Sequence, residues 1–165
     1  MARDFIDRFE AEWRDSRPDM DVAEVAGILR AIRLVGALDR ELAVIAGRHG
    51  LKPGQFNVLA ALRRQGRALS PKDLVASSIL TSGALTPVLD KLEGAGLVRR
   101  EADPEDRRGI RVALTELGRV TIDAALDERM ARHYRLAEAL SPAERATLAR
   151  LMRKLSLAQE GTAPD

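Results

Sequence analysis

The chain has 165 residues, of which 45% are hydrophobic and 32% charged, a balance typical of one folded domain with an extension. The formal net charge is +2, and no segment approaches the roughly 20 apolar residues that cross a bilayer. The absence of cysteine excludes disulfides, thiolate zinc sites and thiol redox switches. Because the N-terminus is too acidic and amphipathic for a signal peptide, we expect a cytoplasmic protein without membrane association.

The first third of the chain is predicted to be helical. An amphipathic pattern covers about residues 3–15, and a polar break follows it. A longer helix is predicted over residues 22–49, because apolar residues recur there at helical spacing until Gly50. This helix would be about 40 Å long, more than a small domain requires. We therefore assign residues 1–50 to N-terminal dimerisation helices.

Residues 51–115 have the pattern of a winged helix-turn-helix domain for DNA binding. Pro53 opens one helix, and the segment 70–73 (Ser-Pro-Lys-Asp) starts another with an N-cap serine, a first-turn proline and an acid. A tight turn leads into a third helix, which begins near residue 80 and ends at Gly94. Its inward face carries four apolar residues at helical spacing: Leu85, Val88, Leu89 and Leu92.

A basic β-hairpin is predicted after that third helix. Alternating runs at residues 97–102 and 110–114 flank a turn-forming stretch with Arg107 and Arg108 at its tip. Phosphate binding requires clustered cations, and five arginines cluster here: Arg99, Arg100, Arg107, Arg108 and Arg111. A helix followed by a basic-tipped hairpin points to double-stranded DNA as the partner.

Charge is distributed unevenly along the chain. Residues 63–119 hold eleven basic and eight acidic side chains, a net charge of +3. Residues 1–50 hold eight basic and ten acidic ones, a net charge of −2. Ordinary surface scatter gives differences of this size, so the balance supports the DNA interpretation only together with the clustered arginines.

Residues 116–165 are predicted to form C-terminal dimerisation helices. One long helix covers about residues 115–140, and a capping box at residues 141–144 starts the last helix. The apolar stripes at both ends of the chain have no third layer to cover them, which indicates a two-fold homodimer. The expected fold class is mainly α with a small β-hairpin wing: a winged helix-turn-helix flanked by long N- and C-terminal dimerisation helices.

Several segments match a known family in order and spacing: Gly83-Ala84-Leu85-Thr86, Leu92-Glu93, Gly96-Leu97-Val98, Asp103-Pro104-Glu105-Asp106-Arg107-Arg108 and Val112-Ala113-Leu114-Thr115-Glu116-Leu117-Gly118. On these segments the chain resembles the multiple antibiotic resistance regulator (MarR) family of bacterial transcription factors, over about residues 21–158. The resemblance implies a triangular homodimer that binds pseudo-palindromic operators, usually represses, and releases DNA when a small molecule binds between its lobes.

The resemblance also implies a set of DNA-binding residues. Arg108 would enter the minor groove, Asp106 would orient it, and Arg107 lies beside them at the wing tip. The groove-facing side of the recognition helix would carry five residues: Thr81, Ser82, Ala84, Thr86 and Lys91. Many relatives have an arginine or asparagine where this chain has Pro87, so we expect more of the affinity to come from Arg108, phosphate contacts and DNA shape.

A small-molecule effector is implied by the same resemblance. Urate-responsive members place a tryptophan at the position of Trp13, and an interface anchor is the simpler role for such a side chain. The matching pocket acid and arginine are Asn57 and Val88 in this chain, which argues against urate. We expect an apolar or phenolic effector, or none, with Trp13, Phe56 and Asn57 as candidate ligand-binding residues.

Catalytic, metal and cofactor sites are not expected. His49 and His133 are the only histidines, and packing or capping explains both better than metal binding. The acidic residues of the wing turn lie beside arginines, where solvated ion pairs are the rule, and no phosphate loop or nucleophile elbow is present. The remaining alternative is a helical protein-interaction scaffold with a degenerate winged helix, and Asp106 and Arg108 at the wing tip argue against it.

Overall fold

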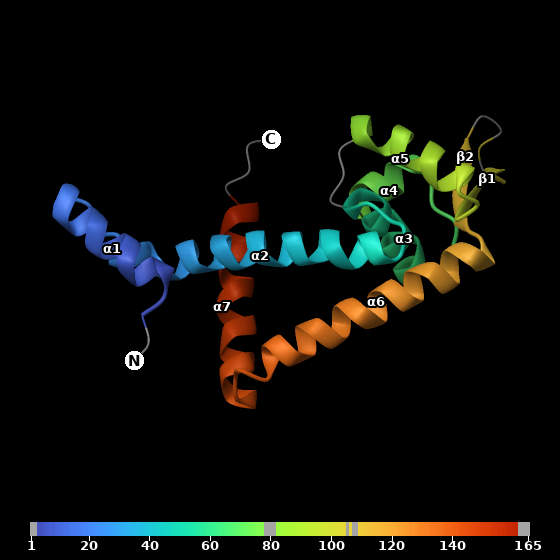
Figure 1. Ribbon diagram of the computed structural model, residues 1–165. Coiled ribbons are helices and arrows are strands. Elements are labelled where there is room, and N and C mark those ends of the chain that lie inside the picture. Colours follow the sequence, from blue (N-terminus) through green and yellow to red (C-terminus); the bar gives the residue numbers. More distant parts are fainter. Residues whose placement is uncertain (1–2, 78–81, 105, 107–108, 162–165) are drawn as a thin grey trace.

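The computed structural model describes residues 3–77, 82–104, 106 and 109–161 (Figure 1). In chain order the elements are α1 (Phe5–Ser16), a 3-10 turn (Ala23–Val25), α2 (Ala26–Arg48), α3 (Pro53–Gln65), α4 (Pro71–Ser77), α5 (Ser82–Gly94), β1 (Val98–Ala102), β2 (Ile110–Leu114), α6 (Glu116–Ala137) and α7 (Pro142–Glu160). The predicted fold class, mainly helical with one hairpin in a winged-helix arrangement, is confirmed. The predicted turn at 78–80 lies outside the described residues.

The hydrophobic core belongs to the winged-helix part of the chain. It unites α3, α4, α5 and the hairpin with the C-terminal half of α2 and the first half of α6. Phe56, Leu62 and Leu92 are each at most 1% exposed. The hairpin is antiparallel, with Val98 opposite Leu114 at its root. It is extended by Leu69, whose backbone exchanges two hydrogen bonds with Val112 in β2, at 3.0 and 2.8 Å.

The start of α6 is fastened to the root of the hairpin. The Thr115 hydroxyl donates to the Gly96 carbonyl at 2.7 Å and accepts from the Gly118 N–H at 3.0 Å, which caps the helix. The Thr115 N–H donates to the Leu97 carbonyl at 3.1 Å. Gly118 has no room for a side chain, because a Cβ there would lie 1.9 Å from that same carbonyl oxygen. The helix and the wing therefore share one rigid joint.

The long N-terminal helix is shorter than predicted. The sequence pattern suggested a start at Val22, but α2 begins at Ala26 after a 3-10 turn. No side chain caps α2, whereas Asp21 accepts a hydrogen bond from the Ala23 N–H at 3.0 Å and so favours the tighter turn. Val22 and Ala26 are buried with Ile6 where α1 packs on α2.

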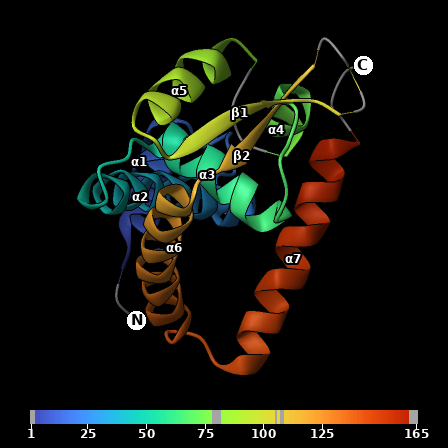
Figure 2. The same cartoon turned by 90° about the vertical axis from the view of Figure 1, so that its right-hand side faces the viewer.

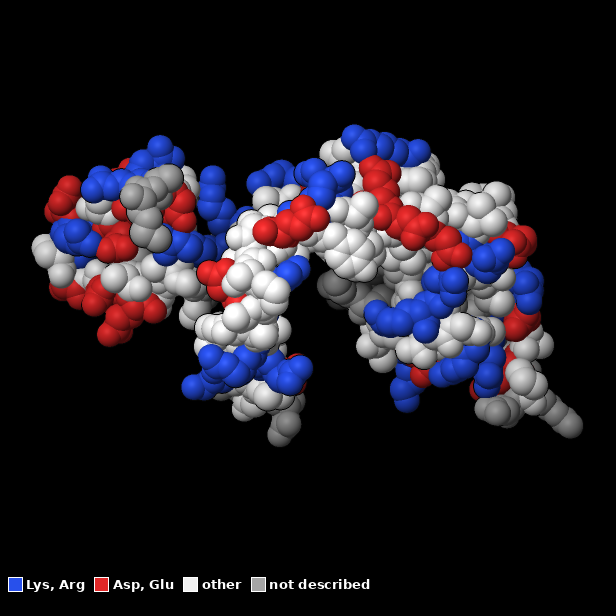
Figure 3. Space-filling view, turned by 90° about the horizontal axis from the view of Figure 1, so that it is seen from below, with Lys and Arg blue, Asp and Glu red and all other residues white. Residues whose placement is uncertain are grey.

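The helices outside the winged domain leave much apolar surface uncovered. α1 lies at the end of α2 that is remote from α3 (Figure 1), and α7, which crosses α2 in Figure 1, is seen in Figure 2 to stand apart from the other helices. No residue of α7 is buried, and α2 exposes Ile28, Ile32 and Val35 along its N-terminal half. Where α7 projects, the centre of Figure 3 is largely uncharged. None of the described helices combines the length and the hydropathy needed to cross a membrane.

Candidate nucleic-acid interface

Helix α5 presents one face to the core and the other to solvent. Leu85, Leu89 and Leu92 are buried, as the spacing predicted, while Thr86 and Lys91 are exposed and Ala84 is half-buried at the edge of the inward face. The hairpin lies on the same side of the winged domain as α5 (Figure 2). The geometry therefore offers a small-residue helix face with a hairpin beside it, a shape that fits a major groove and its flanking backbone.

Pro87 lies inside α5, at its sixth residue. Proline has no N–H, so the Gly83 carbonyl, four residues earlier, lacks its usual helical donor. Gly83 is exposed and has no side chain to crowd the proline ring. Beside Pro87, the exposed polar side chains of this helix include Thr86, Asp90 and Lys91.

Arg100 on β1 joins the hairpin to α5. Its guanidinium group donates to Asp90 at 2.7 Å and to Glu93 at 2.6 Å, and its backbone N–H donates to Glu93 at 3.0 Å. The hydrogen bond to Asp90, and after it that to Glu93, raises the pKa of Arg100 above its ordinary value. The clustering of arginines predicted a phosphate-binding role for Arg100, but in the structure this side chain holds the wing against α5.

The base of the wing turn is closed by a second ion pair. Arg111 on β2 lies 2.9 Å from Asp103, whose side chain is only 11% exposed. The Asp103 N–H donates to the Gly109 carbonyl at 3.0 Å, and the Gly109 N–H donates to the Asp106 carbonyl at 2.8 Å. A Cβ at Gly109 would lie 3.1 Å from Asp103 and Asp106, so the turn is tight. Arg111, like Arg100, is thus engaged within the wing.

The structure describes only some of the expected DNA-binding residues. Thr81, Arg107 and Arg108 lie outside the described residues, and Ser82 is placed only as the first residue of α5. Asp106 is described and exposed, next to the positions of the tip arginines. Their DNA-binding roles remain predictions from the sequence.

The expected effector residues do not lie together in one chain. Phe56 is buried, and Asn57 is half-buried beside it. Both line a hollow of about 630 Å³ between α3 and α6, where the Arg129 guanidinium lies 5.2 Å from the centre of the Phe56 ring. Trp13 instead packs edge-on against Phe9 in α1, and α1 lies at the end of α2 that is remote from α3 (Figure 1).

His49 joins the end of α2 to α6, a contact that the sequence analysis did not predict. Its Nε2 lies 3.1 Å from Glu128, which also accepts from Arg48. The hydrogen bond from His49, and then that from Arg48, lowers the pKa of Glu128. His133 is half-buried on α6. Within the part of the chain that is described, no three His, Asp or Glu side chains are grouped to hold a metal ion.

Comparison with known proteins shows which family this chain resembles. The family model described as "MarR family" matches residues 51–110, the winged-helix core. The HTH-type transcriptional regulator PecS of Dickeya dadantii is 32% identical over 143 residues, which cover 86% of both chains.

Solved structures of regulators with a similar fold also match this chain. NadR in complex with 4-hydroxyphenylacetate is 25% identical, with a TM-score of 0.65 over 77% of this chain and 89% of that one. BpsR of Bordetella bronchiseptica, whose DNA binding is regulated by 6-hydroxynicotinic acid, is 29% identical, with a TM-score of 0.61 over 77% and 98%. PecS is named as a transcription regulator, which agrees with the expectation that this chain is not an enzyme. The chain belongs to the MarR family of DNA-binding transcription regulators.

Proposed function

We propose that two copies of this chain form a homodimer that binds a pseudo-palindromic operator and represses transcription until a small effector releases it. The observation that carries the proposal is the pairing of an exposed helix face with a clamped hairpin on one side of the winged domain (Figure 2). The arrangement suits a recognition helix in the major groove and a wing in the adjacent minor groove.

On DNA, the face of α5 would carry specificity and the wing tip would carry much of the affinity. Ala84 and Thr86 are short enough to let the helix backbone approach base edges, and Lys91 is exposed toward the end of the same helix. Arg108 is proposed to enter the minor groove, where the negative potential is enhanced, and Asp106 to orient it. Because Arg100 and Arg111 are engaged in ion pairs, we expect the tip arginines to contribute more of the DNA affinity.

Dimerisation is supported by the uncovered apolar faces. On α7, four residues at helical spacing, Leu148, Leu151, Met152 and Leu155, are each 41–48% exposed. On α2, Ile32 is 63% exposed. A soluble monomer rarely leaves contiguous apolar surface of this kind in water, and a two-fold axis lets the same faces cover one another.

The hollow beside Phe56 and Asn57 is our candidate effector site. It lies between the winged domain and α6, so a ligand there would contact both. NadR is seen in complex with 4-hydroxyphenylacetate, and the DNA binding of BpsR is regulated by 6-hydroxynicotinic acid; both compounds are hydroxylated aromatic acids, which supports the phenolic class of effector. Because Trp13 is remote from Asn57 in the same chain, a stacking role for it would require the Trp13 of the second copy.

Titration of the full-length protein against the DNA flanking its own gene, over a series of salt concentrations, tests this function. We expect one dimer on two half-sites about 34 Å apart and an affinity that falls steeply with salt, because arginine–phosphate contacts release counterions. Addition of 4-hydroxyphenylacetate is the first test for release, and Asn57→Ala should blunt the release while leaving the ligand-free affinity unchanged. A salt-independent interaction or a preference for single strands would contradict the proposal.

A further inference from the structure

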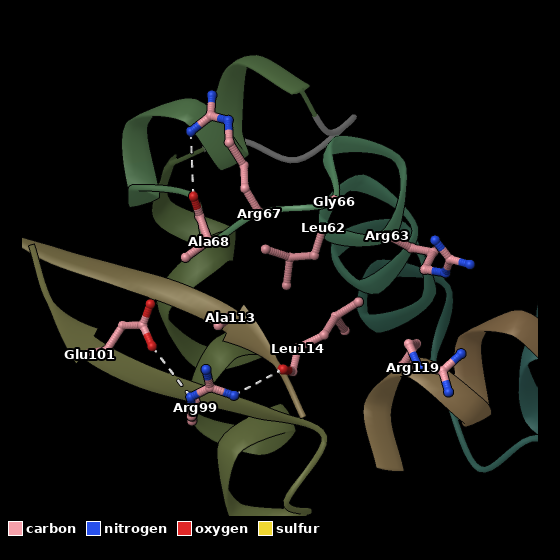
Figure 4. A pocket seen from close by; sticks show the side chains of 10 residues that line it. All are labelled: Leu62, Arg63, Gly66, Arg67, Ala68, Arg99, Glu101, Ala113, Leu114 and Arg119. Carbon is pink, nitrogen blue, oxygen red and sulfur yellow. Dashed lines mark hydrogen bonds and ion pairs between the residues drawn. The ribbon is translucent and has the colours of Figure 1, made fainter. Parts of the chain in front are cut away.

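A second hollow, of about 350 Å³, opens at the root of the wing (Figure 4). Its walls come from the last turn of α3, the segment that follows it, both hairpin strands and the start of α6. These elements lie at the end of the molecule remote from α1 and α7 (Figure 1). The apolar faces proposed to form the dimer therefore do not reach this hollow.

The inner surface of this wing-root hollow is apolar. Leu62 and Leu114 lie at its centre in Figure 4, with Ala68 and Ala113 beside them. Leu62 is 1% exposed and Ala113 is 7% exposed, so the floor is part of the packed core and keeps its shape.

Arginines from separate segments surround the floor. Arg63 from α3 and Arg119 from α6 share the carboxylate of Asp123, at 2.6 and 3.4 Å. Arg119 is also paired with Glu116. These two guanidinium groups are therefore balanced by neighbouring carboxylates.

The other two arginines are less well balanced. Arg99 on β1 lies 3.3 Å from Glu101 and donates to the Leu114 carbonyl at 3.2 Å. Arg67 donates only to the Ala68 carbonyl, at a long 3.4 Å. Among the described residues no carboxylate lies within ion-pair distance of Arg67. Four guanidinium groups thus face three carboxylates, and the surplus positive charge lies at Arg67.

We propose that the wing-root hollow binds a small organic oxyanion, a carboxylate or phosphate ester carried on a compact apolar body. The Arg67 guanidinium lies over Ala68 at the edge of the hollow (Figure 4), and its planar fork matches two oxyanion oxygens. The body of the ligand would rest on Leu62 and Leu114, and Arg99 can cover an aromatic ring with its planar group. This site is distinct from the hollow at Phe56 and Asn57 and shares only Arg63 with it.

Occupancy would stiffen the wing. The ligand would touch β1 through Arg99, β2 through Leu114 and α6 through Arg119. The hairpin is joined to α6 at Thr115 and Gly118, so a bound ligand would add a second connection between the hairpin and α6.

Calorimetric titration of the full-length dimer with phenyl phosphate tests the proposal without DNA, so its failure is separable from failure of the proposed function. We expect one phenyl phosphate per chain, and binding weaker by about tenfold in Arg67→Ala, a loss of about 1.4 kcal/mol. Arg67→Lys should recover part of the affinity, and Arg8→Ala, which removes a charge on α1, should change nothing. Inorganic phosphate lacks the ring and phenol lacks the phosphate, so both should bind more weakly than phenyl phosphate. Titration with benzoate shows whether a carboxylate can replace the phosphate.

Amide chemical shifts locate the ligand. Changes centred on Ala68, Ala113 and Leu114 support the wing-root site, whereas changes centred on Asn57 and Ser77 would assign binding to the other hollow and overturn the proposal. Absence of binding, or equal binding by the parent and Arg67→Ala, would overturn it too. Thermal melts of each variant verify folding, which Arg67→Ala should not disturb because that side chain makes no ion pair.

Discussion

Glu93 on the recognition helix is held twice by Arg100 on the wing, once through the backbone N–H at 3.0 Å and once through the guanidinium group at 2.6 Å. Asp90, one helical turn earlier, accepts from the same guanidinium group at 2.7 Å. Helix α5 and strand β1 therefore cannot change their angle without breaking charge-assisted hydrogen bonds. In the proposed complex, these hydrogen bonds would set the angle at which α5 and the wing meet the DNA.

Glu93→Gln should weaken operator binding by about 1 kcal/mol, because a charge-assisted bond is replaced by a neutral one and the wing loosens. Simple electrostatics predicts the opposite sign, since the variant removes a negative charge beside DNA. Glu101→Gln is the matched control, because it removes a carboxylate from the same hairpin without touching α5, and it should bind as well as or better than the parent. Titrations at one fixed salt concentration measure both affinities. Tighter binding by Glu93→Gln would show that the Arg100–Glu93 contact does not contribute to DNA binding.

Arg108→Ala should lower operator affinity by about 1–3 kcal/mol and leave the dimer folded, if this arginine enters the minor groove. Arg108→Lys should recover only part of the loss, because lysine lacks the planar fork. Asp106→Ala should act in the same direction with a smaller effect. Equal affinity of Arg108→Ala and the parent at one salt concentration would show that the tip arginines are only solvated charges.

The extent to which these features could be predicted depended on how local they are. The run at residues 110–114 coincides with β2, and the serine at residue 70 caps α4 with Asp73 as its spacing indicated. Such elements are specified by neighbours in sequence. The partners of Arg100 depend on the angle between α5 and β1, which no spacing rule gives. The clustering of arginines in the sequence therefore could not predict that Arg100 and Arg111 are held in ion pairs.

The same limit applies to the candidate effector residues. Phe56 and Asn57 are neighbours in sequence on α3, and both line one hollow. Whether Trp13 joins them depends on the direction of α1. Its first turn is held to α2 by ion pairs of Asp4 and Asp7 with Arg30, at 2.7 and 2.6 Å, contacts between residues more than 20 positions apart that no local pattern predicts.

Gly118→Ala should lower the free energy of unfolding by about 2–3 kcal/mol or more, because the new Cβ would overlap the Leu97 carbonyl 1.9 Å away. Gly47→Ala is a matched control in an exposed helical position with nothing within 4 Å, and it should stabilise the protein by about 0.5–1 kcal/mol. Urea denaturation measures both. A Gly118→Ala protein as stable as the parent would mean that the wing and α6 are not rigidly joined.

The stability of the junction between α2 and α6 should fall in acid. His49, and then Arg48, lowers the folded-state pKa of Glu128 below the ordinary value of 4.5. A lowered carboxyl pKa contributes stability that is present above 4.5 and is lost as the pH falls through the lowered value. Glu128→Gln should therefore show a flatter decline of stability below that pH than the parent, in urea denaturation at successive pH values. Glu138→Gln, at the end of the same helix, should follow the parent curve.

Leu151→Glu should convert the dimer to a monomer or an aggregate, because it places a charge in the middle of the apolar face of α7. Operator affinity should fall with it, since one winged domain then meets only one half-site. Arg150→Glu, the neighbouring residue, reverses a charge outside that face and should leave the assembly intact. Sedimentation equilibrium measures the mass, and a folded Leu151→Glu dimer would exclude α7 from the interface.

Helix α6 runs unbroken for 22 residues from the wing root to α7, a length of about 33 Å. A straight rod fixed to the wing at one end is a lever. Pivoting by about 10° at the α7 end moves the wing root by about 6 Å, close to two base-pair steps of about 3.4 Å each. In the proposed homodimer, a modest rearrangement where the two copies meet would thus carry the wing out of register with its groove, so the interface between the copies needs to move far less than the wing.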